Sequence, residues 1–505
     1  MSQGDSPGRA QLDETEHGSG EEDAGRRASS DRRAWHVLAV VLVGSFMAVL
    51  DTTIVNVALP SIAKGTGASS AALEWVVSGY ALTFGLALVP AGRLGDRFGT
   101  KPLFLSGLLL FTLASVGCGI AQSPSQLIAA RVVQGLGAGI YYPAISATIQ
   151  RTFSGRERSR AFGYLGSVVG ISTAVGPLLG GVLIELAGED SGWRWVFLVN
   201  LFVGAAVFPV ALRVLPRPED RKSHQFDPVG NLLLAAVLLL VLVPLVEGRS
   251  DGWPLWSFVC LVGALPVAAG LGAWEIRFIR RGGEPVLRPD LFRHRSFAAG
   301  QLLALLYFAG FTSLFFTLSI LWQEGLGRSA LAAGLLVVPF ALGSLLTASN
   351  SDRFSTWLGR KTVMIGCTAM LFGQATMLVA LHLSAPDPSA LWFIGPLVVA
   401  GLGNGLVIAP NQDFVLGSVP KREAGTAGGS LIMAQRVGAA IGIAVIGTVL
   451  FGSASSSASS ARVDPVLVHT AQTATMVNLA FVALALICTF ALPHTLGEER
   501  ASENQ

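Results

Sequence analysis

Fourteen long apolar segments follow one another along this 505-residue chain, and they constrain its fold more than any other feature. Each is long enough to cross about 30 Å of hydrocarbon at about 1.5 Å per helical residue. Because a bilayer offers no hydrogen bonds to the backbone, segments of this kind are expected to be helices. The sequence therefore predicts an all-α polytopic membrane protein with 14 transmembrane helices. The expected spans are 36–60, 71–91, 102–121, 126–149, 161–187, 194–214, 228–247, 254–274, 296–322, 330–350, 361–383, 389–412, 430–452 and 472–493.

The composition excludes an ordinary soluble protein. Charged residues make up 13% of the chain, against about 25% in soluble domains, and 51% of the residues are hydrophobic. Most of the surface must therefore face lipid. The net charge of +3 is too small to indicate a nucleic-acid partner. The four cysteines lie in apolar stretches, where free Cys is usually a small buried hydrophobe, and they show no disulfide or metal pattern: Cys118, Cys260, Cys367 and Cys488.

Basic residues are distributed unevenly between the two sides of the membrane. Of the 35 Lys and Arg residues, 28 lie in tails and loops on the side of the N-terminus, five lie on the other side, and Arg131 and Arg436 lie within spans. Cytoplasmic loops retain positive charge. We therefore expect a multi-pass protein of the inner (plasma) membrane with both termini in the cytoplasm.

The first 35 residues are rich in Gly, Ser and charged residues and have no apolar periodicity. This composition predicts a disordered cytoplasmic tail for residues 1–35. A secretory signal is excluded, because the first apolar run begins near Trp35 and has the length of a span, whereas a signal core has about 7–15 residues.

The connection between the second and third spans reads GRLGDRFGTK, residues 92–101. Glycine permits a tight turn, and an aspartate can accept hydrogen bonds from basic partners. The composition alone also fits an ordinary basic loop with an acidic helix cap. The full string resembles the signature loop, motif A, of the major facilitator superfamily, which implies a cytoplasmic latch. The motif comprises Gly92, Arg93, Gly95, Asp96, Arg97, Gly99 and Lys101.

A weaker copy of this motif occurs at residues 351–361, between the tenth and eleventh spans. The position fits the parallel repeats of the superfamily, two six-helix halves, here with two helices inserted between them. The expected division is a tail (1–35), an N-terminal half (36–214), two inserted helices with a cytoplasmic linker (215–295), a C-terminal half (296–494) and a cytoplasmic C-terminal tail (495–505).

Four more strings narrow the resemblance. LDTTIVNVALP, residues 50–60, looks like the first-span motif of fourteen-span drug:proton antiporters, and RVVQGLG, residues 131–137, looks like motif B. GPLLGG, residues 176–181, resembles the core of motif C, the antiporter signature, although Ser172 stands where glycine is common. WRWVFLVN, residues 193–200, resembles the sixth-span entry of the same branch. The resemblance covers roughly residues 36–495 and implies proton-coupled export.

Asp51 lies in the middle of the first span. An aspartate at that depth costs about 2.5–3.5 kcal/mol on insertion scales, so a function is the default hypothesis. The functional interpretation is a proton carrier, since burial favours the neutral carboxyl and a nearby cation favours the charged one. The alternative is a structural partner for a neighbouring hydroxyl or amide.

Arg131 is the candidate for that cation. At about 1.5 Å per residue, Asp51 and Arg131 lie about 5 and about 10 Å outward of their helix midpoints, so their depths agree to within an Arg side chain. The alternative is an Arg that extends to the outer interface.

The remaining candidates carry no reactive group or lie near span ends. Pro177 kinks the fifth span and its glycines permit close helix contact, which the resemblance links to the antiport conformational change. These antiporter-motif residues are Gly170, Gly176, Pro177, Gly180 and Gly181. Side chains that could line a cavity are Asn56, Tyr80, Gln134, Asn404 and Gln412. The acids Glu74, Glu185 and Asp413 are expected to be solvated helix ends, and the role of Arg436 stays open.

No lysine follows a glycine, and no His-Glu-x-x-His pair is present, which argues against a nucleotide site and metallo-hydrolysis. The sequence thus predicts a non-enzyme without cofactor or metal that exports small hydrophobic compounds, cations among them, as a monomer and at the expense of the proton gradient. Two alternatives stay open: export of a native metabolite such as an antibiotic or siderophore, and a membrane sensor or scaffold that moves no solute.

Overall fold

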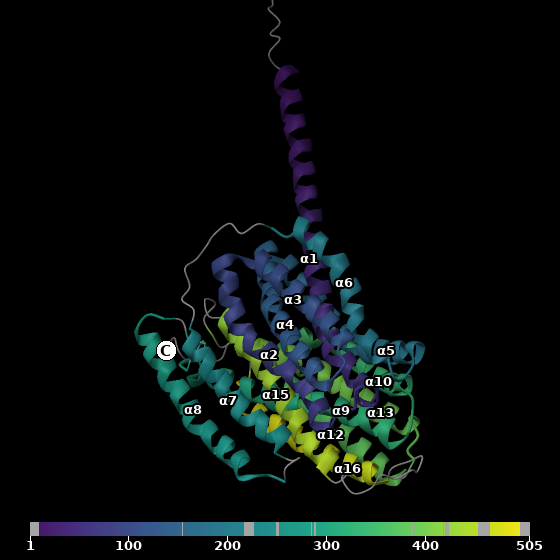
Figure 1. The fold of residues 1–505 in the computed structure, drawn as a ribbon. Helices are drawn as coiled ribbons and strands as arrows, with labels where there is room; N and C mark the ends of the chain where they lie inside the picture. Colours follow the sequence, from purple (N-terminus) through teal and green to yellow (C-terminus); the bar gives the residue numbers. More distant parts are fainter. Residues whose placement is uncertain are drawn as a thin grey trace, which may run out of the picture.

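The computed structural model describes residues 10–153, 155–216, 227–248, 252–283, 285–286, 289–384, 387–417, 419, 424–452 and 465–494. Within these ranges every regular element is a helix, and the helices form one bundle (Figure 1). The first six are α1 (Ala10–Thr66), α2 (Ser70–Phe98), α3 (Thr100–Ile120), α4 (Pro124–Thr152), α5 (Gly155–Ala187) and α6 (Trp193–Val214). Next come α7 (Pro228–Glu247) and α8 (Leu255–Arg280).

The C-terminal group begins after the short turn η1 (Leu291–Arg293). Its long helices are α9 (Arg295–Ile320), continued by η2 (Leu321–Gly325), α10 (Ala330–Ala348), α12 (Arg360–Leu383), α13 (Leu391–Gly405) with α14 (Ile408–Gly417), α15 (Ala424–Gly452) and α16 (Pro465–Thr489). The short helix α11 (Ser351–Leu358) lies between α10 and α12.

Thirteen helices of the described chain are long and apolar enough to cross a membrane. The fourteenth long helix, α4, carries the polar side chains of Arg131 and Gln134, and it packs against α2 and α3 inside the bundle. The all-α fold predicted from the sequence is confirmed. The inserted pair is peripheral: α8 is largely exposed, and α7 contacts α2 and α15.

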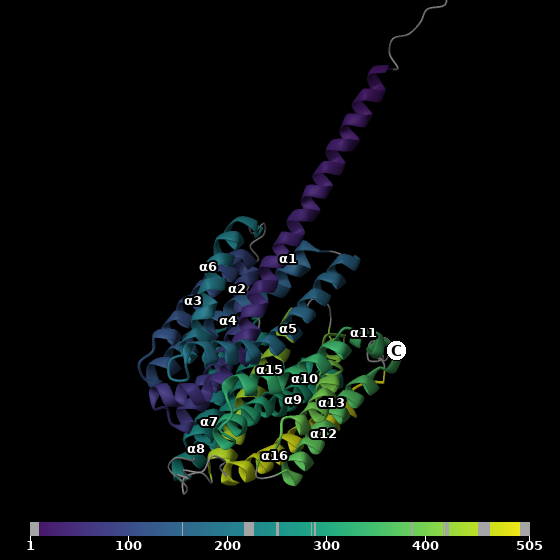
Figure 2. The same cartoon turned by 90° about the vertical axis from the view of Figure 1, so that its right-hand side faces the viewer.

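The structure differs from the expected N-terminal tail. Helix α1 extends back to Ala10 and projects from the bundle as a long rod (Figures 1 and 2). Between Ala10 and Pro60 the sequence has no proline, and a helix that already exists propagates more easily than a new one nucleates. Residues 1–9 lie outside the described residues, as do residues 495–505.

Two kinds of connection define the two sides of the bundle. The turn between α1 and α2 contains Gly67, with φ +68°, and the turn between α2 and α3 contains Gly99, with φ +93°. Both need a left-handed backbone that glycine adopts without strain. We call the two sides the Gly67 side and the Gly99 side. On the Gly67 side, the hydroxyl of Ser69 caps α2 by accepting a hydrogen bond from the Ala72 amide.

The two groups of six helices repeat a contact on the Gly99 side. At the start of α3, the Lys101 ammonium donates to the carbonyls of Leu212 and Leu215 at the end of α6. At the start of α12, the Arg360 guanidinium donates to the carbonyl of Leu492, after the end of α16. A cation thus holds the third helix of each group to the sixth. The expected division into domains stays a prediction.

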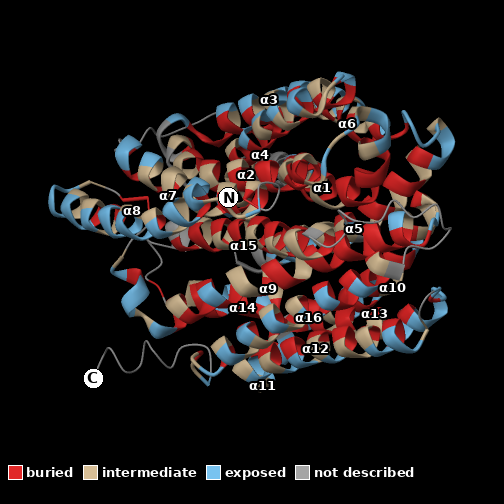
Figure 3. Ribbon diagram, turned by 60° about the horizontal axis from the view of Figure 1, so that its bottom comes forward, coloured by how far each residue is buried: buried red, intermediate tan, exposed pale blue. Residues whose placement is uncertain are grey.

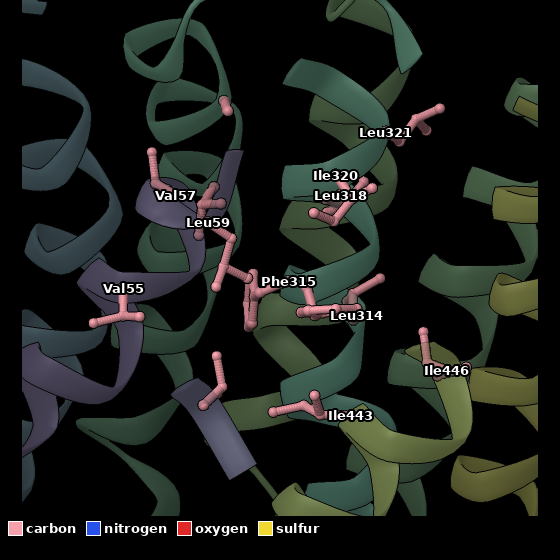
Figure 4. Close-up of a cluster of buried hydrophobic side chains, with 14 of the residues drawn as sticks. Val55, Val57, Leu59, Leu314, Phe315, Leu318, Ile320, Leu321, Ile443 and Ile446 are labelled. Carbon is pink, nitrogen blue, oxygen red and sulfur yellow. The ribbon is translucent and has the colours of Figure 1, made fainter. Parts of the chain in front are cut away.

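The halves are joined unequally on the two sides. On the Gly67 side one hydrophobic core contains residues of α1, α2 and α6 together with residues of α9, α10 and α15. Leu59 of α1 and Phe315 of α9 are both part of this core (Figure 4). Toward the Gly99 side, buried residues of the N-terminal half form one core, against which Ile432 of α15 packs, and residues of α9, α14 and α15 form another. Between these levels, α2 and α15 meet in a smaller core with α7.

Helix α5 shows the same asymmetry along its own length. Its Gly67-side half lies between α1 and α10, where a side chain on Gly181 would overlap the α10 backbone. In its Gly99-side half, added side chains at Gly163 and Gly166 would meet nothing within 4 Å. Figure 3 shows α1–α6 as one group and α9–α16 as another, with many buried residues on α1, α5, α9 and α10. Among the described residues, the halves therefore share one core on the Gly67 side and pack less closely on the Gly99 side.

Candidate functional site

Asp51 of α1 and Arg131 of α4 form an ion pair inside the N-terminal half. The Arg131 Nη1 atom lies 2.5 Å from the Asp51 Oδ2 atom, and the two side chains are 1% and 0% exposed. Truncating one partner of such a pair leaves an uncompensated buried charge, which typically costs about 3–5 kcal/mol. The pair therefore fixes α1 to α4 as long as the carboxylate is charged.

Two amides bind the carboxylate, and a serine holds both of them. The second oxygen, Oδ1, accepts hydrogen bonds from the amides of Gln134 at 2.8 Å and Asn200 at 3.1 Å. Both amides also donate to the Ser115 hydroxyl, which itself donates to a backbone carbonyl of α6. Helices α1, α3, α4 and α6 thus all contribute to one buried network.

The Arg131 side chain is held by further contacts. Its Nε donates to the Val76 carbonyl of α2 at 2.9 Å, and Nη1 also donates to Gln134 Oε1 at 2.8 Å. The guanidinium carbon lies 4.1 Å from the centre of the Tyr80 ring and 5.6 Å from that of Phe197. The remaining nitrogen, Nη2, is buried without a hydrogen-bond partner. One donor therefore stays available beside the carboxylate.

This arrangement can hold or release one proton. A charged carboxylate keeps the attraction of Arg131 and accepts from two amides, whereas a protonated one loses the ionic attraction and must redirect one amide. Protonation therefore weakens the link between α1 and α4. No group of three or more His, Cys, Asp or Glu among the described residues is placed to bind a metal ion.

Two members of the network are absent from the residues singled out in the sequence. Asn200 lies in the WRWVFLVN string, so its motif marks it although its type alone does not. Ser115 lies in an ordinary apolar span with no local signal.

The antiporter motif extends over the Gly99-side half and the Gly67-side half of α5. A side chain on Gly176 would overlap Thr53 of α1, and one on Gly180 would overlap Ile54. Pro177 is buried, and its backbone packs against Gly334 of α10. Gly170, six residues before Gly176, has open space around it. The motif therefore makes close helix contacts only from Gly176 onward.

The five candidates for a cavity lining fall into different places. Gln134 belongs to the Asp51 network, and Tyr80 is buried over Arg131. Asn404 is buried in the C-terminal half, where its amide bonds to Tyr307 and Ser344. Each of these three residues is bonded inside one half in this conformation, and their role as cavity lining stays a prediction. Asn56 is also buried, at the contact with α9, and Gln412 is exposed on α14.

The predicted latch is described only in part. Gly99 forms the turn, a side chain on Gly92 would meet nothing within 4 Å, and Gly95 packs against Leu103. Lys101 binds the end of α6, as above. The side chains of Arg93, Asp96 and Arg97 lie outside the described residues.

Among the acids near span ends, Glu185 and Asp413 are exposed, which agrees with solvated helix ends. The same expectation was wrong for Glu74. It is 0% exposed and packs against Gly447 of α15, where a side chain would overlap its carboxylate. Helix α15 covers Glu74, and the sequence of α2 alone does not reveal this contact.

Comparisons with known proteins agree with this geometry. The sequence profile of the Major Facilitator Superfamily matches residues 41–443. The chain is 37% identical to the "Probable actinorhodin transporter" of Streptomyces coelicolor, over 86% of this chain and 75% of that protein. It is 32% identical to the methylenomycin A resistance protein of Bacillus subtilis, over 83% and 88%. It is 31% identical to the tetracenomycin C resistance and export protein of Streptomyces glaucescens, over 83% and 76%.

Solved structures share the fold at low identity. A POT family transporter in complex with a thioalcohol-conjugated peptide superposes with a TM-score of 0.64 at 15% identity, over 89% of this chain and 95% of that one. The xylose transporter XylE from E. coli, in a partially occluded inward open conformation, gives 0.61 at 12% identity, over 91% and 97%.

Two helical halves that meet across the bilayer, with an ion pair buried in one of them, define a multi-pass membrane transporter. The chain belongs to the Major Facilitator Superfamily. The family resemblance stated from the sequence motifs is thereby confirmed. Secondary transporters of this superfamily use ion gradients, so the chain is no enzyme and needs no cofactor.

Proposed function

We propose that this protein exports small hydrophobic compounds from the cytoplasm in exchange for protons. The observation that carries the proposal is the Asp51–Arg131 pair, a titratable carboxylate fully buried beside its counter-ion in a membrane helix. Relatives named for antibiotic resistance and export support the direction of transport.

The direction of the chain in the membrane follows from its charge. The Gly99 side carries the basic loops of the sequence, so it is the cytoplasmic side. The described residues of the two halves pack less closely on that side, which supports an inward-facing conformation. In this conformation a compound enters from the cytoplasm or the inner leaflet.

The exchange then couples cargo to proton. A proton that binds Asp51 from the Gly67 side removes the carboxylate charge and releases Arg131, which lets α1 and α4 shift relative to each other. Return to the inward-facing state restores the ion pair and releases the proton to the cytoplasm. A membrane potential adds about 2.3 kcal/mol per charge per 100 mV to the proton's driving force.

The proposal has two forms, which differ in the native substrate. General drug efflux is one form, and export of a self-made antibiotic is the second. The 37% identity to a probable actinorhodin transporter and the 31% identity to a tetracenomycin C export protein favour the second form. A non-transporting sensor is the remaining alternative, and a flux measurement separates it from both.

The test uses the purified full chain in proteoliposomes with an imposed pH gradient and a panel of hydrophobic dyes and aromatic antibiotics. Asp51→Asn should abolish uphill transport and leave downhill exchange. The matched control is Asp387→Asn, which breaks an exposed ion pair with Arg328 and should transport normally. Uphill transport at the wild-type rate by Asp51→Asn excludes proton coupling through this residue. If the wild-type protein transports none of the compounds, the result supports the sensor alternative.

A further inference from the structure

Arg436 is a second cation within the membrane, and the proton site does not use it. It lies on α15, three residues before the midpoint of the span Ala427–Phe451, or about 4.5 Å at 1.5 Å per residue. A charge at that depth is costly unless a partner compensates it. Among the described residues Arg436 forms no ion pair, and its Nε is buried without a hydrogen-bond partner.

The surroundings of Arg436 are aromatic and belong to the other half. The guanidinium carbon lies 4.3 Å from the centre of the Phe84 ring on α2. The Phe84 ring contacts that of Tyr142 on α4, with ring centres 5.5 Å apart. Tyr142 is half-buried, and its hydroxyl makes no hydrogen bond to any described residue. A cation and a free phenol therefore lie beside rings where the two halves meet.

Close packing brings Arg436 to this place. A Cβ added at Gly85 of α2 would lie 3.2 Å from the Cβ of Arg436, so the glycine lets α15 approach α2 closely. At this level the halves touch through α2 and α15, and toward the Gly99 side the described residues of the two halves form different cores. Arg436 thus stands at the inner edge of the contact between the halves, where a compound entering from the cytoplasm would arrive.

We infer that Arg436 binds the acidic group of an aromatic substrate, such as a carboxylate or an ionised phenol, while Phe84 and Tyr142 contact its rings. The inference rests on the proposed function, export of small hydrophobic compounds, and it specifies the substrate class. It also reverses the sequence-based expectation of cationic cargo. A guanidinium offers planar, charge-assisted hydrogen bonds that suit a carboxylate. The anion would supply the partner that Arg436 lacks within the protein.

The test compares two probes with the same ring system and opposite charge. Fluorescein carries a carboxylate and a phenolate, and rhodamine 123 is a cationic ester on the same xanthene ring. Equilibrium binding to the full chain in nanodiscs, read by fluorescence anisotropy, needs neither a gradient nor transport. It therefore stays informative whether or not the protein proves to be a proton-coupled exporter.

Wild type should bind fluorescein more tightly than rhodamine 123. Arg436→Gln should weaken fluorescein binding by roughly tenfold or more and leave rhodamine 123 binding unchanged or stronger. Arg436→Lys, which keeps the charge, should fall between the two. Arg194→Gln is the matched control, because Arg194 also stacks on an aromatic ring, at 4.4 Å from Trp193, but donates to two carbonyls. It should leave the ratio of the two affinities unchanged.

The ratio of the two affinities can also contradict the inference. An unchanged ratio in Arg436→Gln, or a wild type that prefers rhodamine 123, overturns it. Where the Gln variant does not yield monodisperse protein, the Lys variant decides. Its ammonium lacks the planar fork, so fluorescein binding at full wild-type strength with Lys overturns the inference as well.

Discussion

Gly176 of α5 lies so close to Thr53 of α1 that a methyl group on the glycine would overlap the threonine hydroxyl. Both residues belong to strings that resemble antiporter motifs, and the contact joins the first and fifth helices on the Gly67 side. Gly170 of the same motif meets nothing within 4 Å. The two glycines therefore make a matched pair for mutation.

Gly176→Ala should impair transport and lower the free energy of unfolding by about 1–3 kcal/mol, because overpacking forces the helices apart. Gly170→Ala should change neither by much. Dye efflux in a pump-deficient host and thermal unfolding in detergent measure both effects. Equal losses in the two variants would show that the motif acts through something other than this contact.

Arg131 should be needed for uphill transport, because its guanidinium compensates the buried charge of Asp51. Arg131→Ala should therefore abolish uphill transport driven by a pH gradient or reduce it strongly. Arg131→Lys should restore it only in part, because a point charge lacks the planar fork. Flux into proteoliposomes measures both variants, and wild-type uphill transport by the Ala variant would leave the two residues uncoupled.

The Tyr80 ring should stabilise the ion pair through the Arg131 guanidinium. Tyr80→Leu removes a ring 4.1 Å from that group, and loss of a desolvated cation–π contact typically costs about 0.5–2 kcal/mol. Tyr80→Phe keeps the ring and loses only a 3.3 Å hydrogen bond to the Ala48 carbonyl. Thermal unfolding should rank wild type and Phe above Leu. If Tyr80→Phe is as unstable as Tyr80→Leu, the loss of stability comes from the hydroxyl and not from the ring.

Accessibility should differ between the two sides of the bundle. In a background without native cysteines, Gly166→Cys on α5 should react with a membrane-impermeant thiol reagent applied to inside-out vesicles. Ile443→Cys, in the core that joins the halves, should be protected.

Adding Asp96→Ala to these cysteine variants should change the labelling pattern, because the latch motif implies charge-assisted bonds that hold one state. Unchanged labelling with Asp96→Ala counts against a latch.

Much of the fold can be read from the sequence because hydrophobic length alone fixes a transmembrane helix. The limits of α3, α6 and α7 agree with the expected spans to within a few residues. The depth of Asp51 and Arg131 along their helices is likewise a matter of counting. Tertiary packing decides which faces of α1 and α4 meet. The network partner Ser115 therefore carries no local signal, and Asn200 is marked only by its motif.

The limits of prediction from sequence share one physical cause. Gln134 and Asn404 are polar residues of membrane helices. The sequence does not tell whether such a side chain lines a cavity or forms hydrogen bonds within one six-helix half. Glu74 lies at a helix start, where solvent is the ordinary neighbour, yet α15 covers it. In each case a helix distant in sequence decides the environment.

The single core on the Gly67 side also has a thermodynamic meaning. To open outward, the protein must separate α1 from α9 and break the apolar contact between the halves that includes Leu59 and Phe315 (Figure 4). In the proposed export cycle, bound cargo would have to supply the free energy that exposes this surface. Mutations that weaken this apolar contact should then loosen the dependence of turnover on cargo, and the protein would admit protons without export.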